Sequence, residues 1–249
     1  AVAITGDSTM RARHSEFAAA EDWIGGLDVP ITLDVGNHDM PYFNLIERFV
    51  TPYKRFGRLR SVVEREIDLP GIALVPLKTA VRAQPRFNWS KGWVTGRALD
   101  KCLAQIDALP KGTRVLVTVH HPLREVGTAG TAMTRGGAKA LAELAQRDVL
   151  GVLSGHVHDA FDIMEDTPHG PVRMIGAGTL SQRLRSTPPS FNELHWNGET
   201  LRVCIRNLEN VDDEAMKIDD VPEDAQPPRH EGEPVAPVHA VPRTDPPES

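Results

Sequence analysis

The chain has 249 residues, 40% of them hydrophobic, and a formal net charge of −6 at pH 7. This length and apolar content can build one large core, so we expect a single domain over residues 1–208 followed by a separate segment over 209–249. No apolar run is long enough to span a membrane, and the first residues lack a signal-peptide pattern. The sequence therefore predicts a cytoplasmic protein without a membrane partner.

Acidic residues and prolines are concentrated in the C-terminal segment. From Val211 to Ser249 there are eleven acidic and three basic residues, a net charge of −8 that leaves +2 for the rest of the chain. The same stretch holds eight of the twenty prolines and few large apolar side chains, which predicts disorder. The remainder shows no basic stripe, so its charge does not indicate a nucleic-acid partner.

The first elements predict a β-α-β unit with two parallel strands, in which the helix buries one apolar face. A later alternating stretch predicts an edge strand, and the more uniformly apolar stretch after it predicts a central strand. These elements are a strand at Ala1–Thr5, a helix at Ser15–Gly26 with Phe17, Ala20, Trp23 and Ile24 on its apolar face, a strand at Ile31–Val35, helical turns at Met40–Phe49, the edge strand Ser61–Leu69 and the central strand Gly71–Thr79.

The second half begins with an irregular segment, Arg82–Gly92, whose Phe87 and Trp89 either line a pocket or pin the loop to the core. Helices and parallel strands then alternate, and the last four strands are antiparallel in character. The predicted elements are a helix at Thr95–Leu109 capped by Thr95, a strand at Arg114–Val119, a loop at Gly127–Gly137, a helix at Ala138–Arg147, and strands at Val149–Leu153, Ala160–Met164, Val172–Ile175, Phe191–Trp196 and Thr200–Leu208. Cys102 and Cys204 fall in a helical and a strand pattern, which indicates core residues and no disulfide.

Four of the predicted strands end in side chains of the types that bind metals. These are Gly6-Asp7, Gly36-Asn37-His38-Asp39, His120-His121-Pro122 and Gly155-His156-Val157-His158. In isolation each has an ordinary explanation, since Asp7 suits an Asx turn and Asn37 suits a helix cap. Open α/β sheets place their sites at the carboxyl ends of strands, so we expect the four motifs to converge. A carboxylate can join two cations, an amide offers a neutral oxygen, and imidazoles suit Fe, Mn or Zn.

In that order the four motifs resemble the calcineurin-like metallophosphoesterase superfamily over about residues 1–208. The stretch from Gly178-Thr179-Leu180-Ser181 to Phe191-Asn192 is similar to bacterial class III cyclic-nucleotide phosphodiesterases. The resemblance implies a four-layer α/β/β/α sandwich of two mixed sheets that holds two metal ions. In the metal site that it implies, Asp7 bridges both metals, Asn37, His120 and His156 complete one metal's shell, and His158 serves the other. Beside the metals, His38 lies next to the phosphate, Asp39 orients His38, and His121 supports its neighbours.

The activity that the resemblance implies is hydrolysis of a small phosphodiester, with a cyclic nucleotide as one candidate, by attack of a metal-bound hydroxide. Members of the superfamily usually carry an Asp-x-His motif before Gly-Asp, and this chain contains none. We therefore expect the fold to lack its first strand and helix, and this chain to hold one metal in place of two. Catalysis by this chain stays open, as do two alternatives: a pseudo-phosphoesterase with a binding role only, and a phosphomonoesterase or nuclease on the same scaffold.

Overall fold

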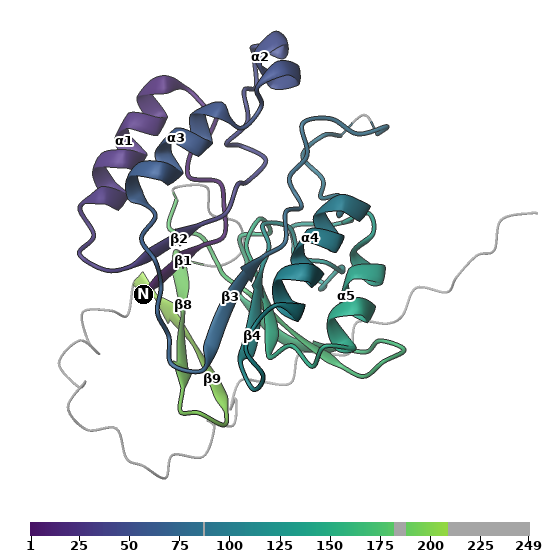
Figure 1. Cartoon of the computed structure of the whole chain (residues 1–249). Helices are drawn as coiled ribbons and strands as arrows, with labels where there is room; N and C mark the ends of the chain where they lie inside the picture. The colour runs from purple at the N-terminus through teal and green to yellow at the C-terminus, as the bar shows by residue number, and fades with distance from the viewer. Residues whose placement is uncertain (87, 182–187, 209–249) are drawn as a thin grey trace, which may run out of the picture. The chain divides into compact units, whose positions relative to one another are not determined.

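The computed structural model describes residues 1–86, 88–181 and 188–208, all within one compact unit, Ala1–Asp212. In chain order the elements are β1 (Val2–Ile4), α1 (His14–Gly25), β2 (Ile31–Leu33), α2 (Leu45–Val50), α3 (Lys54–Val63), β3 (Ile72–Pro76), α4 (Gly96–Asp107), β4 (Arg114–Thr118), α5 (Gly137–Ala145), β5 (Gly151–Ser154), β6 (Phe161–Glu165), β7 (Val172–Gly176), β8 (Ser190–Trp196) and β9 (Leu201–Asn207) (Figure 1). The tail predicted to be disordered, together with Phe87, lies outside the described residues. Among the described helices, none has both the length and the apolar composition needed to cross a membrane.

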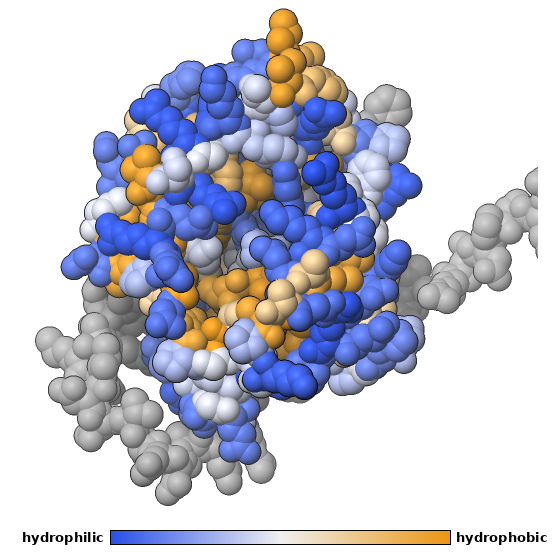
Figure 2. Space-filling view, viewed as in Figure 1, coloured by the Kyte–Doolittle hydropathy of each residue, from blue (hydrophilic) through white to orange (hydrophobic). Residues whose placement is uncertain are grey.

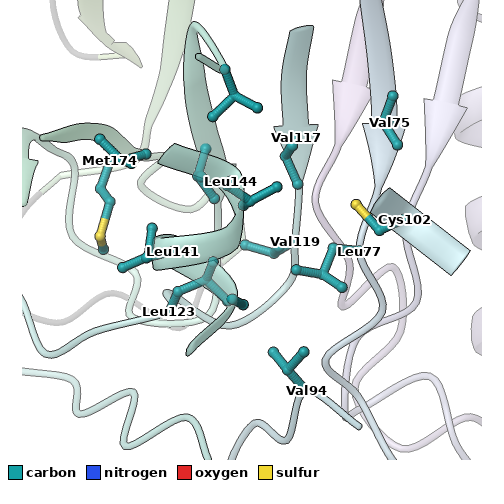
Figure 3. Packing of buried hydrophobic residues seen from close by; sticks show 14 of the residues in the cluster. Val75, Leu77, Val94, Cys102, Val117, Val119, Leu123, Leu141, Leu144 and Met174 are labelled. Atoms are coloured by element: carbon teal, nitrogen blue, oxygen red, sulfur yellow. The ribbon is translucent and has the colours of Figure 1, made fainter. Parts of the chain in front are cut away.

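A mixed sheet of five strands, in the order β3-β4-β5-β7-β6, forms the larger part of the fold. Its first four strands are parallel, and β6 joins β7 in the antiparallel direction. Helices α4 and α5 cover one face, where Val117 of β4 packs with Leu144 of α5 and Cys102 of α4 in one buried cluster (Figure 3). This confirms the predicted α/β class and the core position of Cys102, which is a free thiol, as is Cys204 of β9.

The opposite face of this sheet is covered by the antiparallel hairpin β8-β9. Leu116 of β4 and Leu153 of β5 form a second apolar cluster with Leu201 of the hairpin. The sheet is therefore buried on both faces, which explains why its strands are almost continuously apolar.

Strands β1 and β2 pair in parallel and are covered by helices α1 and α3, which confirms the predicted β-α-β opening. Phe17, Ala20 and Ile24 of α1 are buried against this pair, as predicted. Trp23, predicted on the same face, is 59% exposed. At 100° per residue it falls beside the stripe that the other three define.

Two predictions about the segment 61–79 are wrong. The predicted edge strand Ser61–Leu69 begins inside helix α3, because Phe56, Leu59 and Val63 recur at helical spacing and bury one face. The predicted central strand Gly71–Thr79 contains β3, which pairs only with β4 and so lies at the sheet edge. Helix α4 covers one face of β3 and buries its apolar side chains there, so an apolar strand can lie at the sheet edge without a second neighbouring strand.

Helix α2 is shorter than the predicted helical turns over Met40–Phe49. It begins after Asn44, whose side chain accepts a hydrogen bond from the Glu47 backbone N–H at 3.0 Å. The helix exposes Ile46 and Val50 to 79% and 72%. This patch is the hydrophobic tip at the top of Figure 2.

Candidate metal centre

His120 connects the loops that follow four strands. Its Nδ1 atom lies 2.7 Å from the Thr5 carbonyl oxygen after β1, and its Nε2 atom lies 3.1 Å from Oδ1 of Asn37 after β2. The same Nε2 is 3.4 Å from Oδ2 of Asp7. The ring of His156, which follows β5, has its centroid 5.1 Å from that of His120. The structure thus brings together the four residues predicted to hold one metal.

The backbone of these loops adopts conformations that non-glycine residues rarely take. Asp7, His156 and His158 have φ values of 59°, 70° and 64°, in the left-handed region. Gly36 lets the loop after β2 approach the loop after β1 closely, because a Cβ atom at this position would lie only 2.1 Å from Oδ1 of Asp7. Strained residues of this kind cluster at ligand sites when the surrounding structure holds them in place.

Asp39 fastens the loop after β1 to the loop after β2. It is fully buried, and its carboxylate accepts hydrogen bonds from the backbone N–H groups of Asp7, Thr9 and Gly36, each at 2.9 Å. The Thr9 hydroxyl donates a fourth at 3.1 Å. Burial, followed by repulsion from Asp7, raises the pKa of Asp39 to about 6. These bonds give Asp39 a role in positioning Asp7.

His38 contributes to the site through its backbone and its ring. Its backbone N–H donates to Oδ1 of Asp7 at 2.9 Å, which fixes one oxygen of that carboxylate. Its ring Nδ1 lies 2.6 Å from the carbonyl oxygen of Met10. This contact with the Met10 backbone orients the ring. The predicted orienting role of Asp39 stays a prediction.

The charges of Asp7 and His120 are coupled. Burial raises the pKa of Asp7, but the attraction of His120 and a hydrogen bond to its ring outweigh burial, so this pKa lies below its ordinary value. Burial lowers the pKa of His120, while Asp7 and the Thr5 carbonyl raise it to a net value above the ordinary one. Nε2 of His120 faces two oxygen acceptors, so a proton there relieves their repulsion.

His156 and His121 are held in their neutral forms. Burial lowers the pKa of His156, and the neighbouring imidazoles of His121 and His120 disfavour a further proton there. Burial and then His120 likewise place the pKa of His121 well below its ordinary value. A neutral imidazole has a free ring lone pair, which is the form that binds a metal.

His121 is anchored at both ring nitrogens. Nδ1 lies 2.9 Å from the Thr79 hydroxyl oxygen, and Nε2 lies 2.8 Å from the carbonyl oxygen of Ser90. The Thr79 hydroxyl also accepts the backbone N–H of His121 at 3.0 Å. Because the Ser90 carbonyl oxygen can only accept, Nε2 of the neutral ring carries the proton and donates to it, and Nδ1 accepts from the Thr79 hydroxyl. These bonds agree with the supporting role predicted for His121.

A group of three histidines has the geometry to hold a metal ion. Among the described His, Cys, Asp and Glu side chains, one ligand atom each of His120, His121 and His156 lies within 4.8 Å of the others. His121 was predicted to support the site and not to bind the metal; it belongs to this group, but the bonds of its ring to Thr79 and Ser90 favour the supporting role. Asp7 and His158 are outside this group. His158 was predicted to serve a different metal from His120 and His156, and that role stays a prediction.

The donors around His120 suit a divalent cation. Asp7 supplies a carboxylate, Asn37 an amide oxygen, and His120 and His156 imidazole nitrogens, a mixed set accepted by Mn, Fe or Zn. A cation that replaced the proton on His120 would relieve the same crowding of acceptors at Nε2. The residues present therefore fit a single metal ion.

Comparison with known proteins adds no assignment. No protein-family model matches the chain, and no curated protein matches it.

Proposed function

We propose that this chain is a metal-dependent phosphoesterase that hydrolyses a phosphodiester. One observation carries the proposal: side chains from four separate strand ends gather at His120, where Asn37 and Asp7 oxygens lie 3.1 and 3.4 Å from Nε2 and the His156 ring lies 5.1 Å away between centroids. These residues would hold the cation. When bound, it supplies positive charge that stabilises the charge developing on phosphoryl oxygens, and it lowers the pKa of water.

The residues around this centre have positioning roles in the proposal. Thr5 fixes the tautomer of His120 by accepting from Nδ1, so that Nε2 faces the cation. Asp39 and the His38 backbone hold Asp7 from two sides. The half-buried ring of His38 is the side chain that we assign to the phosphate, as a donor to an oxygen of the substrate.

The layering of the fold supports the superfamily that the sequence motifs resemble. Helices α1 and α3 cover β1-β2, the hairpin β8-β9 covers one face of the five-stranded sheet, and α4 and α5 cover the other (Figure 1). We propose that this arrangement is a form of the four-layer α/β/β/α sandwich. On this proposal the motif order and the convergence of the loops have one common explanation.

The test is hydrolysis of bis(4-nitrophenyl) phosphate by protein depleted of metal and then assayed with and without Mn²⁺. We expect Mn²⁺ to raise the rate, and we expect His156→Ala and Asn37→Ala to remove most of that rise by removing a ligand. His169→Ala is the matched control, because His169 is exposed in the turn after β6. Equal rates with and without Mn²⁺ would contradict metal-dependent phosphoesterase activity.

A second candidate is a metal-binding protein without hydrolytic activity. The observation that favours it is that this chain contains no Asp-x-His motif, from which the superfamily that it resembles takes ligands for the second metal. The two candidates differ in one result. Tight binding of Mn²⁺ that is lost in His156→Ala, with no Mn²⁺-dependent rate, would support the binding role and exclude the enzyme.

A further inference from the structure

A cleft of about 670 Å³ lies between helices α3 and α4 and borders the metal centre at His120. Its walls come from two edge strands, through Asp34 after β2 and Leu77 after β3, and from Phe56 of α3 and Ala98 of α4. A second cavity of about 500 Å³ shares Phe56 and further residues with it, so the two adjoin. Figure 2 shows this face of the molecule hollowed between the two helices. The volume is in the range of sites for small organic ligands.

The floor of the cleft is apolar and aromatic. Leu33, Phe56 and Leu77 are buried there, at 2%, 5% and 1% exposure. The rings of Tyr53 and Trp93 are half-buried in the walls. The accessible parts of these two rings can bind the body of an aromatic ligand by stacking and by removal of apolar area from water, while the three buried side chains close the floor beneath it.

The rim carries an excess of positive charge. Five basic residues line the cleft, against one acid, Asp34: they are Arg60, Lys78, Arg82, Arg97 and Lys101. Arg60 is paired with Glu64, and Arg82 donates to the Phe49 carbonyl. In the described part of the chain, no ion pair includes Lys78, Arg97 or Lys101.

The charges on the two lysines and on Asp34 indicate that an anion would be favourable there. Partial desolvation, followed by repulsion from Lys101, lowers the pKa of Lys78 to about 8. Its ammonium lies 3.0 Å from the centre of the Tyr53 ring, a cation–π contact. Burial raises the pKa of Asp34 to about 6, so at pH 7 it still carries most of its charge, and the rim keeps five basic residues against this one acid. An anionic group between Lys78 and Lys101 would relieve their repulsion.

We propose that this cleft binds an organic anion with an aromatic body and a phosphate, sulfonate or carboxylate group. The aromatic body lies against Tyr53 and Trp93, and the anionic group contacts Lys78 and Lys101. His120 lines one side of the cleft, so the ligand is a neighbour of the candidate metal centre. Binding requires none of the metal ligands, and the proposal is therefore independent of the phosphoesterase activity.

The experiment is calorimetric titration of the full chain, in EDTA, with 1,5-naphthalenedisulfonate. The comparison ligands are 1-naphthol, which has the aromatic body alone, and inorganic pyrophosphate, which has the charge alone. We expect the disulfonate to bind at least about tenfold more tightly than either, because it uses both floor and rim. We also expect its affinity to fall steeply towards about 1 M salt, where the Debye length is about 3 Å.

Variants locate the site on the rim. The double variant Lys78→Gln with Lys101→Gln should bind the disulfonate at least about tenfold more weakly, whereas Lys139→Gln should match the wild type. Lys139 is an exposed lysine of α5 that does not line the cleft. Circular dichroism checks that each variant is folded. If the double variant does not fold, the salt dependence of disulfonate binding by the wild type remains the test of the charged rim. No binding of the disulfonate, or equal affinity in the folded double variant, would overturn the proposal.

Discussion

Replacing Asp39 by alanine tests how strongly the metal-centre loops are fastened to each other. The side chain is fully buried and accepts from three backbone N–H groups, on Asp7, Thr9 and Gly36. In Asp39→Ala these three donors lose their acceptor, and the loops after β1 and β2 lose the carboxylate that joins them. We expect a large loss of unfolding free energy.

The magnitude follows from two opposing contributions. A buried donor without an acceptor costs about 1–3 kcal/mol, so three donors at about 2 kcal/mol each give about 6 kcal/mol. Removal of the carboxylate also removes the cost of burying its charge near Asp7. The rise of its pKa from 3.8 to about 6 corresponds to about 3 kcal/mol at 1.36 kcal/mol per unit. The expected net loss for Asp39→Ala is therefore about 3 kcal/mol.

The assay is urea unfolding at pH 7, followed by circular dichroism, with EDTA present so that metal binding does not add to stability. Asp28→Ala is the control, because Asp28 is exposed and lies 3.9 Å from its partner Arg65. The control should change stability by no more than about 0.5 kcal/mol. Asp39→Asn keeps one acceptor oxygen and should fall between the wild type and Asp39→Ala. A loss below about 1 kcal/mol in Asp39→Ala would refute the fastening role.

Two further predictions concern pH and the histidines. Because burial raises the pKa of Asp34 from 3.8 to about 6, its contribution to stability is full below pH 3.8 and is lost as the pH rises through 6. In the wild type this lowers the free energy of unfolding by up to about 3 kcal/mol between pH 4 and pH 7.5, and Asp34→Asn should remove that decrease. If urea unfolding gave the same pH dependence for the wild type and Asp34→Asn, the prediction would be contradicted. His121→Gln should weaken Mn²⁺ binding only about 10–100-fold, as expected for a supporting residue, whereas His156→Gln should abolish tight binding. If calorimetry found the two variants equally impaired, His121 would have to be a ligand.

The convergence of the loops could be predicted from sequence because it follows from strand geometry. Asp7 and Asn37 follow the parallel pair β1-β2, and His120 and His156 follow the parallel pair β4-β5, so each pair brings its carboxyl ends to one edge. The two pairs belong to separate sheets, and the contact of His120 with Thr5 shows that their ends meet. The partners of Asp39 could not be predicted in this way. Its donors at Asp7 and Thr9 are about thirty residues away, and no local pattern shows which backbone N–H groups a buried carboxylate will meet.

The position of His121 and the course of the segment 61–79 also depended on tertiary contacts. Adjacent side chains after a strand point in different directions, and only the contacts with Thr79 and Ser90 decide where the His121 ring lies. In the segment Ser61–Leu69, a partial alternation predicted a strand, while burial of Phe56, Leu59 and Val63 extended helix α3 to Val63. Packing against β1-β2 outweighed the local preference.

The central claim, that Asp7, Asn37, His120 and His156 form one metal site, is tested most directly by metal analysis of the purified chain after loading with Mn²⁺ and dialysis. Four protein ligands are enough to hold one transition-metal ion tightly, so we predict about one equivalent per chain. Asn37→Ala and His156→Ala should each retain well below one equivalent, and His169→Ala should equal the wild type. Less than about a tenth of an equivalent in the wild-type chain, or undiminished metal in both ligand variants, would contradict the claim.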